Sequence, residues 1–358
     1  VGEPDFNTPD FIKEAAKKAI DDNFSRYSPV AGYPALRNAI VAKLKNENGL
    51  EYTAGQISCA NGAKQSVCNT VMVLVNPGDE VIIPAPFWVS YPEMVKLAEG
   101  TPVIVPAGIE QDFKITPAQL EAAITPKSKA LMISYPNNPT GAIMEKKDLE
   151  KIADIVREHD LYVISDEIYS ELTYLERHVT IASLQGMRDR TIVINGFSKS
   201  HAMTGWRLGY ACGPRIIIEQ MLKIHQYAIM CAPTTSQYAA VDALRAGDED
   251  VQRMREEYNG RRRYLMHRFE EMGLECFEPY GAFYCFPCIK EFGMTSEEFA
   301  TNLLKTEKVA VVPGTAFGDC GEGFIRISYA YSLDNLKEAL DRMERYITGL
   351  RGGNNGEA

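Results

Sequence analysis

The chain has 358 residues, of which 45% are hydrophobic and 24% charged, and its formal net charge is −10. This length can bury a large core and predicts two domains. The densest basic run, Arg261–Arg263, lies in a charged helical pattern, so the acidic chain does not resemble a nucleic-acid-binding protein. The sequence contains neither a signal peptide nor an apolar run of about 18 residues, and we therefore expect a cytoplasmic protein without a membrane anchor.

The cysteines and the first residue lead to three smaller expectations. Most of the eight cysteines lie within apolar runs, which is typical of buried free thiols rather than of a disulfide framework. Cys285 and Cys288 have the spacing of a metal-binding pair, but no second Cys or His pair follows at zinc spacing, so we expect no metal site. The chain opens at Val1 without methionine, and we expect that an upstream segment is missing.

Short apolar runs, rich in Val and Ile and without polar alternation, predict strands that are covered on both faces. These runs are residues 80–84, 102–106, 129–134, 161–165, 191–194 and 208–211. Stretches with helical spacing of apolar residues lie between them, for example residues 145–158. The alternation predicts an α/β domain with a mostly parallel sheet between helices.

The pattern changes near residue 248, where a long charged helix is predicted to run to residue 272. Strand-like pieces and a terminal helix follow, at residues 281–286, 309–312, 324–328 and 333–350. We predict a large domain at residues 12–247 and a smaller α+β domain formed by residues 1–11 and 248–350. The polar residues 351–358 have nothing with which to form a core, and we predict a disordered tail there.

Lys199 is the first candidate for chemistry. It follows an apolar strand and lies among small and apolar residues, where burial would lower the pKa of its ammonium group. That property suits a lysine that forms a Schiff base. Arg207, eight residues further on, could hold a phosphate through a bidentate contact. A surface lysine in a loop is the alternative interpretation, and this motif alone does not decide between them.

Asp166 and Tyr169 form a second motif at the end of an apolar strand. Ligands of open α/β sheets bind at the carboxyl ends of the strands. A carboxylate at this place can keep a pyridine nitrogen protonated, and Tyr169 can reach the phenolic oxygen of the same ring. Asp166 could instead simply cap the following turn.

Two further loops carry candidate residues: one follows a strand and the other opens a helix. Asn138 lies in a tight loop between Pro136 and Gly141, and its amide could donate to a phenolate oxygen, although a simple turn is the alternative. The small residues Gly62 and Ala63, followed by Lys64, open a helix and leave backbone N–H groups free for a phosphate. A single loop of this kind is weak evidence for a phosphate site.

Two large side chains complete the set. Trp88 is one of only two tryptophans and could stack on a flat cofactor, although its sequence context taken alone favours a place in the core. Arg326 lies inside an apolar strand, where a guanidinium needs an anion partner. That anion could be a protein carboxylate or the α-carboxylate of an amino acid.

In this order the motifs resemble the class I aminotransferases of fold type I, especially the bacterial aspartate aminotransferases. The likeness covers nearly the whole chain, from residues 2–6 through 27–37 and 76–79 to 312–315 and Arg326. It implies an α/β fold with a large domain, whose mostly parallel seven-stranded sheet lies between helices, and a smaller α+β domain. It also implies the cofactor pyridoxal 5′-phosphate (PLP) and a homodimer with shared active sites.

The resemblance also implies roles for the candidate residues, of which Lys199, Asp166 and Tyr169 would be catalytic. Lys199 would hold the cofactor through a Schiff base and shuttle the proton, while Asp166 would pair with the pyridinium. The remaining cofactor contacts would come from Gly62, Ala63, Lys64, Trp88, Asn138, Tyr169, Ser198, Arg207 and Tyr27, the last from the second subunit. Substrate contacts would come from Gly2, Trp88, Asn138 and Arg326.

One position departs from the family pattern. Many relatives have a serine three residues before the lysine, whereas this chain has Gly196. The phosphate contact then falls to Ser198.

The implied reaction is ping-pong transamination between an L-amino acid, aspartate first, and a 2-oxo acid, 2-oxoglutarate first, through a pyridoxamine form. Prephenate, aromatic or broader specificity stays open, because no arginine that grips a second carboxylate is evident. A PLP-dependent C–S lyase or a cyclopropane-forming synthase of the same fold is the nearest alternative. A regulator that only senses PLP lacks support, since residues 1–60 contain no basic recognition helix. A nicotinamide dehydrogenase is not supported, because no glycine motif of the G-x-G-x-x-G type follows a predicted strand in this chain.

Overall fold

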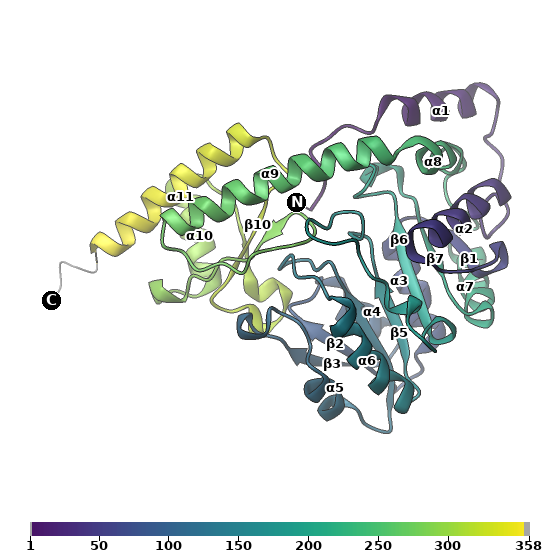
Figure 1. The fold of residues 1–358 in the computed structure, drawn as a ribbon, viewed down its shortest axis with the longest axis horizontal. Coiled ribbons are helices and arrows are strands. Elements are labelled where there is room, and N and C mark those ends of the chain that lie inside the picture. The colour runs from purple at the N-terminus through teal and green to yellow at the C-terminus, as the bar shows by residue number, and fades with distance from the viewer. Residues whose placement is uncertain (1, 354–358) are drawn as a thin grey trace.

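The computed structural model describes residues 2–353, and its centre is a seven-stranded sheet (Figure 1). The strand order is β1-β7-β6-β5-β4-β2-β3. The strands are β1 (Ile57–Ala60), β2 (Glu80–Ala85), β3 (Thr101–Pro106), β4 (Ser128–Ser134), β5 (Tyr162–Asp166), β6 (Thr191–Gly196) and β7 (Gly209–Cys212). Strands β2 to β6 pair in parallel, and β7 runs antiparallel to both β6 and β1. The predicted mostly parallel sheet is therefore confirmed.

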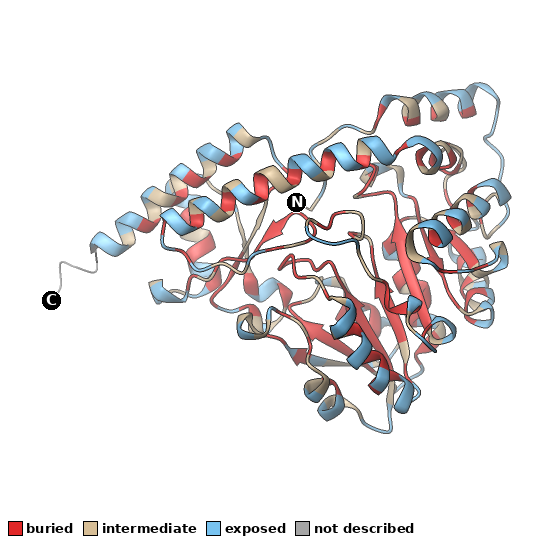
Figure 2. Ribbon diagram, viewed as in Figure 1, coloured by how far each residue is buried: buried red, intermediate tan, exposed pale blue. Residues whose placement is uncertain are grey.

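Helices cover both faces of this sheet, which explains why its strands show no polar alternation. The helices around it are α1 (Asp10–Asp21), α2 (Pro34–Asn48), α3 (Ala63–Leu74), α4 (Ser90–Leu97), α5 (Pro117–Ala123), α6 (Lys146–Glu158), α7 (Arg215–Ala228) and α8 (Thr234–Ala246). Successive side chains of a strand point to opposite faces, so Val163 packs beneath α5 and α6 while Ile164 packs beneath α3, α4 and α7. Figure 2 shows the strands buried and the outward surfaces of these helices exposed.

A smaller antiparallel sheet with the order β8-β10-β9 lies at the other end of the molecule. It comprises β8 (Tyr284–Cys285), β9 (Val312–Pro313) and β10 (Ile325–Ser328), and its helices are α9 (Asp248–Glu271), α10 (Ser296–Glu307) and α11 (Leu333–Gly353). These elements share a hydrophobic cluster of their own. In Figure 1, α9 runs from the end of α8 to this second group of elements. This arrangement agrees with the predicted smaller α+β region, whereas the boundaries at residues 12 and 247 stay a prediction.

Short 3-10 helices connect several of these elements. They are Ala54–Gln56, Ile109–Gln111, Ile181–Ser183, Arg188–Arg190, Thr204–Trp206, Lys290–Phe292, Gly314–Phe317 and Asp319–Gly321. No helix among residues 2–353 combines the length and the apolar character needed to cross a membrane.

Three expectations about local structure need correction. The strand predicted at residues 309–312 is β9, which begins only at Val312, and the one predicted at 281–286 is confined to Tyr284–Cys285. The disordered tail is wrong for residues 351–353, which continue α11. Arg351 donates to the carbonyl oxygens of Met272 and Gly273 and to Glu291, so contacts distant in sequence hold this polar end. Residues 354–358 of the predicted tail lie outside the described residues.

Candidate active site

A cavity of about 470 Å³ lies where the carboxyl ends of β4, β5 and β6 meet residues of the smaller sheet. Most residues selected from the sequence line it, although they come from widely separated segments. These are Gly2, Ala63, Lys64, Trp88, Asn138, Asp166, Tyr169, Ser198, Lys199, Arg207 and Arg326. The structure therefore brings together side chains that the sequence offered only as separate motifs, and it does so at the edge of the sheet where ligands of α/β proteins bind.

Asp166 is the last residue of β5 and lies at the floor of this cavity, buried from solvent. Tyr91 donates its hydroxyl to Oδ2 of Asp166 at 2.7 Å, and the backbone N–H of Ile168 donates to Oδ1 at 3.2 Å. Burial raises the pKa of Asp166 to about 6, while the Tyr91 hydroxyl and Lys199 act in the opposite direction. Above that pH the buried carboxylate is charged, and it can then pair with a cation that enters the cavity.

Lys199 lies across the same cavity, on the segment that follows β6. Burial lowers the pKa of its ammonium group to about 8, although Glu3 and Asp166 favour the charged form. Its Nζ donates to the backbone oxygen of Gly2 and lies 5.9 Å from the centroids of the Tyr169 and Phe283 rings. A lysine with this pKa supplies more neutral amine near neutral pH than a surface lysine, as a nucleophile requires.

The N-terminus of α3 and Arg207 form an anion site on one wall. Gly62 precedes α3 with a φ of 84°, and a Cβ at this position would lie 2.7 Å from Nη2 of Arg207. Gly209 of β7 packs against the backbone of Ala63 so closely that a Cβ would collide with its nitrogen. Arg207 donates to the carbonyl oxygens of Thr204 and Asn61, at 2.8 and 3.3 Å. Within residues 2–353 it pairs with no carboxylate, so its charge is available to a ligand phosphate.

Arg326 forms a second anion site on β10. Its Nη1 donates to Oδ1 of Asn138 at 2.9 Å, and its guanidinium lies between the rings of Tyr284 and Phe317, at 4.6 and 4.9 Å from their centroids. Its Nε is buried, and among the described residues it has no hydrogen-bond partner. A partly buried guanidinium whose Nε has no partner favours an anion, and a carboxylate is the group that its planar fork fits.

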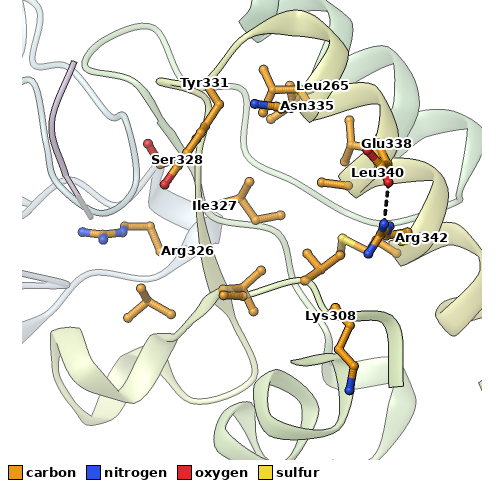
Figure 3. A pocket seen from close by; sticks show the side chains of 17 residues that line it. Leu265, Lys308, Arg326, Ile327, Ser328, Tyr331, Asn335, Glu338, Leu340 and Arg342 are labelled. Carbon is orange, nitrogen blue, oxygen red and sulfur yellow. Dashed lines mark hydrogen bonds and ion pairs between the residues drawn. The ribbon is translucent and has the colours of Figure 1, made fainter. Parts of the chain in front are cut away.

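A second cavity of about 420 Å³ lies between β10 and α11 (Figure 3), and Val312 and Arg326 line both cavities. Its walls include Leu265, Ile327 and Leu340, and the ion pair between Arg342 and Glu338 closes one side. In Figure 3 the side chain of Arg326 points away from Leu265 and Leu340. The guanidinium therefore lies on the side of the first cavity, where it donates to Asn138.

The donor set of the first cavity fits a molecule with a phosphate, a carboxylate and an aromatic nitrogen. Four cationic side chains, those of Lys64, Lys199, Arg207 and Arg326, face one buried carboxylate, that of Asp166. PLP together with an amino acid supplies the two anionic groups and the protonatable ring nitrogen that such a set requires. The residues present thus fit the cofactor that the sequence resemblance implied.

Two predicted residues, Gly62 and Tyr27, do not line the cavity. Ser198 lines it, whereas a Cβ at Gly196 would approach the Cα atom of Gly209 to 2.9 Å, so this backbone leaves no room for a serine there. Tyr27 is 80% exposed and does not line the cavity, so its predicted contact with a second subunit stays a prediction.

Sequence reasoning missed Tyr91 and Tyr284. Tyr91 bonds Asp166 from 75 residues away, and the hydroxyl of Tyr284 lies 2.8 Å from that of Tyr169, which is 115 residues distant. A tyrosine in an apolar context reads as core, and both are indeed buried. Only the Trp88-to-Tyr91 spacing at the start of α4 offered a local signal, because it places both rings side by side, with centroids 5.3 Å apart.

Comparisons with known proteins agree with this geometry. The family described as "Aminotransferase class I and II" matches residues 1–343. An aspartate aminotransferase of Pyrococcus abyssi is 49% identical over 97% of this chain and 90% of its own. An aromatic-amino-acid aminotransferase of Thermococcus litoralis is 47% identical over the same shares. The crystal structure of an aromatic aminotransferase from Pyrococcus horikoshii superposes with a TM-score of 0.96 at 48% identity, covering 98% of this chain and 95% of that one.

The cavity, its cationic walls and the buried Asp166 thus belong to a transferase of amino groups. The chain is a member of the class I and II aminotransferases, a family of PLP-dependent enzymes. The names of its relatives divide between aspartate and aromatic substrates, so family membership alone does not fix the donor.

Proposed function

We propose that this protein binds PLP through Lys199 and transfers amino groups between aspartate and 2-oxoglutarate. The observation that carries the proposal is the pair formed by Lys199, with its lowered pKa, and the buried Asp166, which share one cavity with two arginines that have no carboxylate partner among residues 2–353. When bound, PLP supplies an electron sink that stabilises negative charge at the substrate Cα.

Each residue then has a defined task. Lys199 would take the proton from the substrate Cα as its neutral amine and deliver it to C4′ of the cofactor, in the manner of a general acid and base. Asp166 would hold the proton on the ring nitrogen, and Tyr169 and Asn138 would donate to the ring oxygen. Trp88 would stack on the ring, while Arg207, Ser198 and the backbone at Gly62, Ala63 and Lys64 would hold the phosphate. Arg326, with Asn138 and the backbone of Gly2, positions the substrate carboxylate.

We propose Lys64 as the group that meets the distal carboxylate of aspartate. Its Nζ lies 4.7 Å from the centroid of the Trp88 ring and faces the cavity. Among residues 2–353 it pairs with no carboxylate, so a ligand can take up its charge. A flexible cation of this kind can accept a dicarboxylate and swing away from a larger apolar side chain.

Replacing Lys64 with methionine is therefore expected to raise the KM for aspartate by about tenfold and to leave that for phenylalanine within about twofold, because one partly exposed charge contact is lost. Steady-state kinetics with each donor measures this. Lys129→Met is the matched control, because Lys129 lies on β4 with its Nζ beside the ring of Tyr162 on β5. An equal change for both donors would show that Lys64 does not read the distal carboxylate.

Aromatic amino acids are the second candidate donors. The apolar walls formed by Trp88, Phe317 and Val312, together with the names of two relatives, favour them. To test the function, the visible spectrum of the protein with PLP is recorded while aspartate, glutamate and phenylalanine are added one at a time. We expect aspartate to bleach the band of the lysine-bound cofactor and 2-oxoglutarate to restore it. Product without amino transfer would instead indicate a lyase.

We also propose a homodimer. Large apolar side chains on the α1–α2 loop and at the end of α7 are exposed, among them Tyr27 (80%), Tyr227 (86%) and Ile229 (46%). Large exposed apolar side chains support an interface at these two segments. Through it, Tyr27 would reach the phosphate in the other subunit. Sedimentation of Tyr27→Phe and Tyr227→Asp variants tests this: we expect a dimer for the first and dissociation for the second.

Tyr91→Phe is expected to weaken cofactor binding by about tenfold, because it removes the hydroxyl that bonds the charged form of Asp166. The dissociation constant of PLP, from fluorescence or absorbance titration, measures the effect. Tyr52→Phe serves as the control, since the Tyr52 hydroxyl is buried and has no hydrogen-bond partner among the described residues. Equal affinity in the Tyr91 and Tyr52 variants would contradict the role of this bond.

A further inference from the structure

Two buried tyrosines share a hydrogen bond at the base of the cavity. The hydroxyl oxygens of Tyr169 and Tyr284 lie 2.8 Å apart, and both residues are buried, with 5% and 0% of their surface exposed. Tyr169 follows β5, whereas Tyr284 belongs to β8, so the bond joins the two groups of elements. Each hydroxyl carries one proton, and only one of the two protons can lie between the oxygens.

The surroundings of Tyr284 decide which proton that is. Among the described residues, Tyr169 is the only hydrogen-bond partner of the Tyr284 hydroxyl. Gly2 packs directly against this hydroxyl, since a Cβ on Gly2 would collide with it. A buried hydroxyl proton without an acceptor costs about 1–3 kcal/mol. The Tyr284 proton therefore points to Tyr169.

The proton of Tyr169 is then free for another acceptor. Both tyrosines line the cavity, but Tyr284 is fully buried and Gly2 packs against its hydroxyl, whereas 5% of Tyr169 is exposed. Within residues 2–353 the hydroxyl of Tyr284 is the only hydrogen-bond partner of the Tyr169 hydroxyl. In the opposite arrangement, Tyr169 would donate its hydrogen bond to Tyr284, and the Tyr284 proton would have no acceptor among the described residues. The first arrangement is favoured, and it aims a donor into the cavity, where the proposed function places the ring oxygen of the cofactor.

The backbone and ring contacts fix Tyr284 in this position. It pairs with Ser328 of β10, and its ring contacts those of Phe283 and Tyr169, at centroid distances of 4.9 and 5.8 Å. The guanidinium of Arg326 lies 4.6 Å from the centroid of the same ring. One side chain thus contacts both the proposed carboxylate site and the proposed ring-oxygen donor.

We propose that Tyr284 is a positioning residue that donates its proton to Tyr169 and so orders the Tyr169 hydroxyl as a donor toward the ring oxygen. This inference rests on the proposed function. A hydroxyl that accepts one hydrogen bond becomes a stronger donor in the next. Tyr284 therefore strengthens the contact that stabilises negative charge on that oxygen.

The test is a pH titration of the absorbance of the lysine-bound cofactor in four variants and the wild-type protein. A donor to the ring oxygen would stabilise its negative charge more when the lysine–cofactor linkage is neutral than when the linkage carries a proton that already balances this charge. A weaker donor therefore moves the midpoint upward. For Tyr284→Phe we expect an upward shift of about half a pH unit. Tyr169→Phe is expected to shift it further, and Tyr169→Phe/Tyr284→Phe to match Tyr169→Phe alone, because Tyr284 acts only through Tyr169.

Tyr258→Phe is the matched control, because Tyr258 is a buried tyrosine beside Phe283 whose hydroxyl has no described partner. We expect it to titrate as the wild type does, with all variants melting at similar temperatures. A wild-type midpoint in Tyr284→Phe would overturn the inference, as would additive shifts in the double variant. A wild-type protein that shows no cofactor band would instead overturn the proposed function, and the role of Tyr284 with it.

Discussion

Lys199→Ala is expected to abolish covalent attachment of PLP and to lower the rate of transamination by about 10⁴-fold or more. The variant loses both the amine that bonds the cofactor and the group that moves the proton at Cα, and a positioned general acid–base alone contributes about 10²–10⁴-fold. Reduction with borohydride followed by mass spectrometry measures the attachment. Stopped-flow absorbance measures the loss of the cofactor band on addition of aspartate.

Two controls separate this effect from a loss of fold. Lys129→Ala removes a lysine from the opposite end of the sheet, where its Nζ lies 5.8 Å from the centroid of the Tyr162 ring, and should leave attachment and rate unchanged. A small primary amine added to Lys199→Ala should restore part of the proton transfer. Lys199→Ala with more than one hundredth of the wild-type rate would remove Lys199 from the chemistry.

Asp166→Asn is expected to lower turnover by about a hundredfold to several thousandfold while Lys199 still attaches the cofactor. The amide cannot hold a proton on the ring nitrogen, and breaking a buried ion pair costs about 3–5 kcal/mol. Single-turnover kinetics with aspartate measures the loss. Asp160→Asn, at the other end of β5 and exposed to solvent, is the matched control and should react as the wild type does.

The same residue predicts a pH dependence. Burial raises the pKa of Asp166 to about 6 in the protein without cofactor, so the carboxylate gains a proton as the pH falls through 6. Because only the charged carboxylate pairs with a protonated ring nitrogen, affinity for PLP should fall over that range in the wild type. Asp166→Asn should lack this component of the dependence. Parallel pH profiles of the two proteins would contradict the assignment.

Most of this site could be predicted from the sequence, because its main groups lie at the ends of strands. Asp166 and Lys199 each follow a run of buried apolar residues, and parallel strands deliver such ends to one edge. Arg326 could be singled out because a guanidinium in an apolar strand is unusual. Local context was thus enough to predict the sheet, its approximate strands and the residues that meet at its edge.

Contacts distant in sequence could not be read in this way. Tyr91 and Tyr284 look like core residues, and only tertiary packing turns their hydroxyls toward Asp166 and Tyr169. Arg351 shows the same limit at the C-terminus, because its helical place depends on carbonyl groups at Met272 and Gly273. The start of β9 at Val312 depends on pairing with Arg326 across the small sheet rather than on local propensity.

The close packing of Gly62 and Gly209 around the start of α3 has a consequence for how this site responds to change. Truncating side chains to alanine would register Asp166, Lys199 and Arg207 but would pass over the part of the anion site that the backbone forms at the start of α3. Here the informative substitution adds atoms, because a single methyl group at Gly209 would strike the nitrogen of Ala63. This part of the anion site therefore tolerates no side chain at these two positions, and variation that retunes phosphate affinity has to come from the surrounding residues.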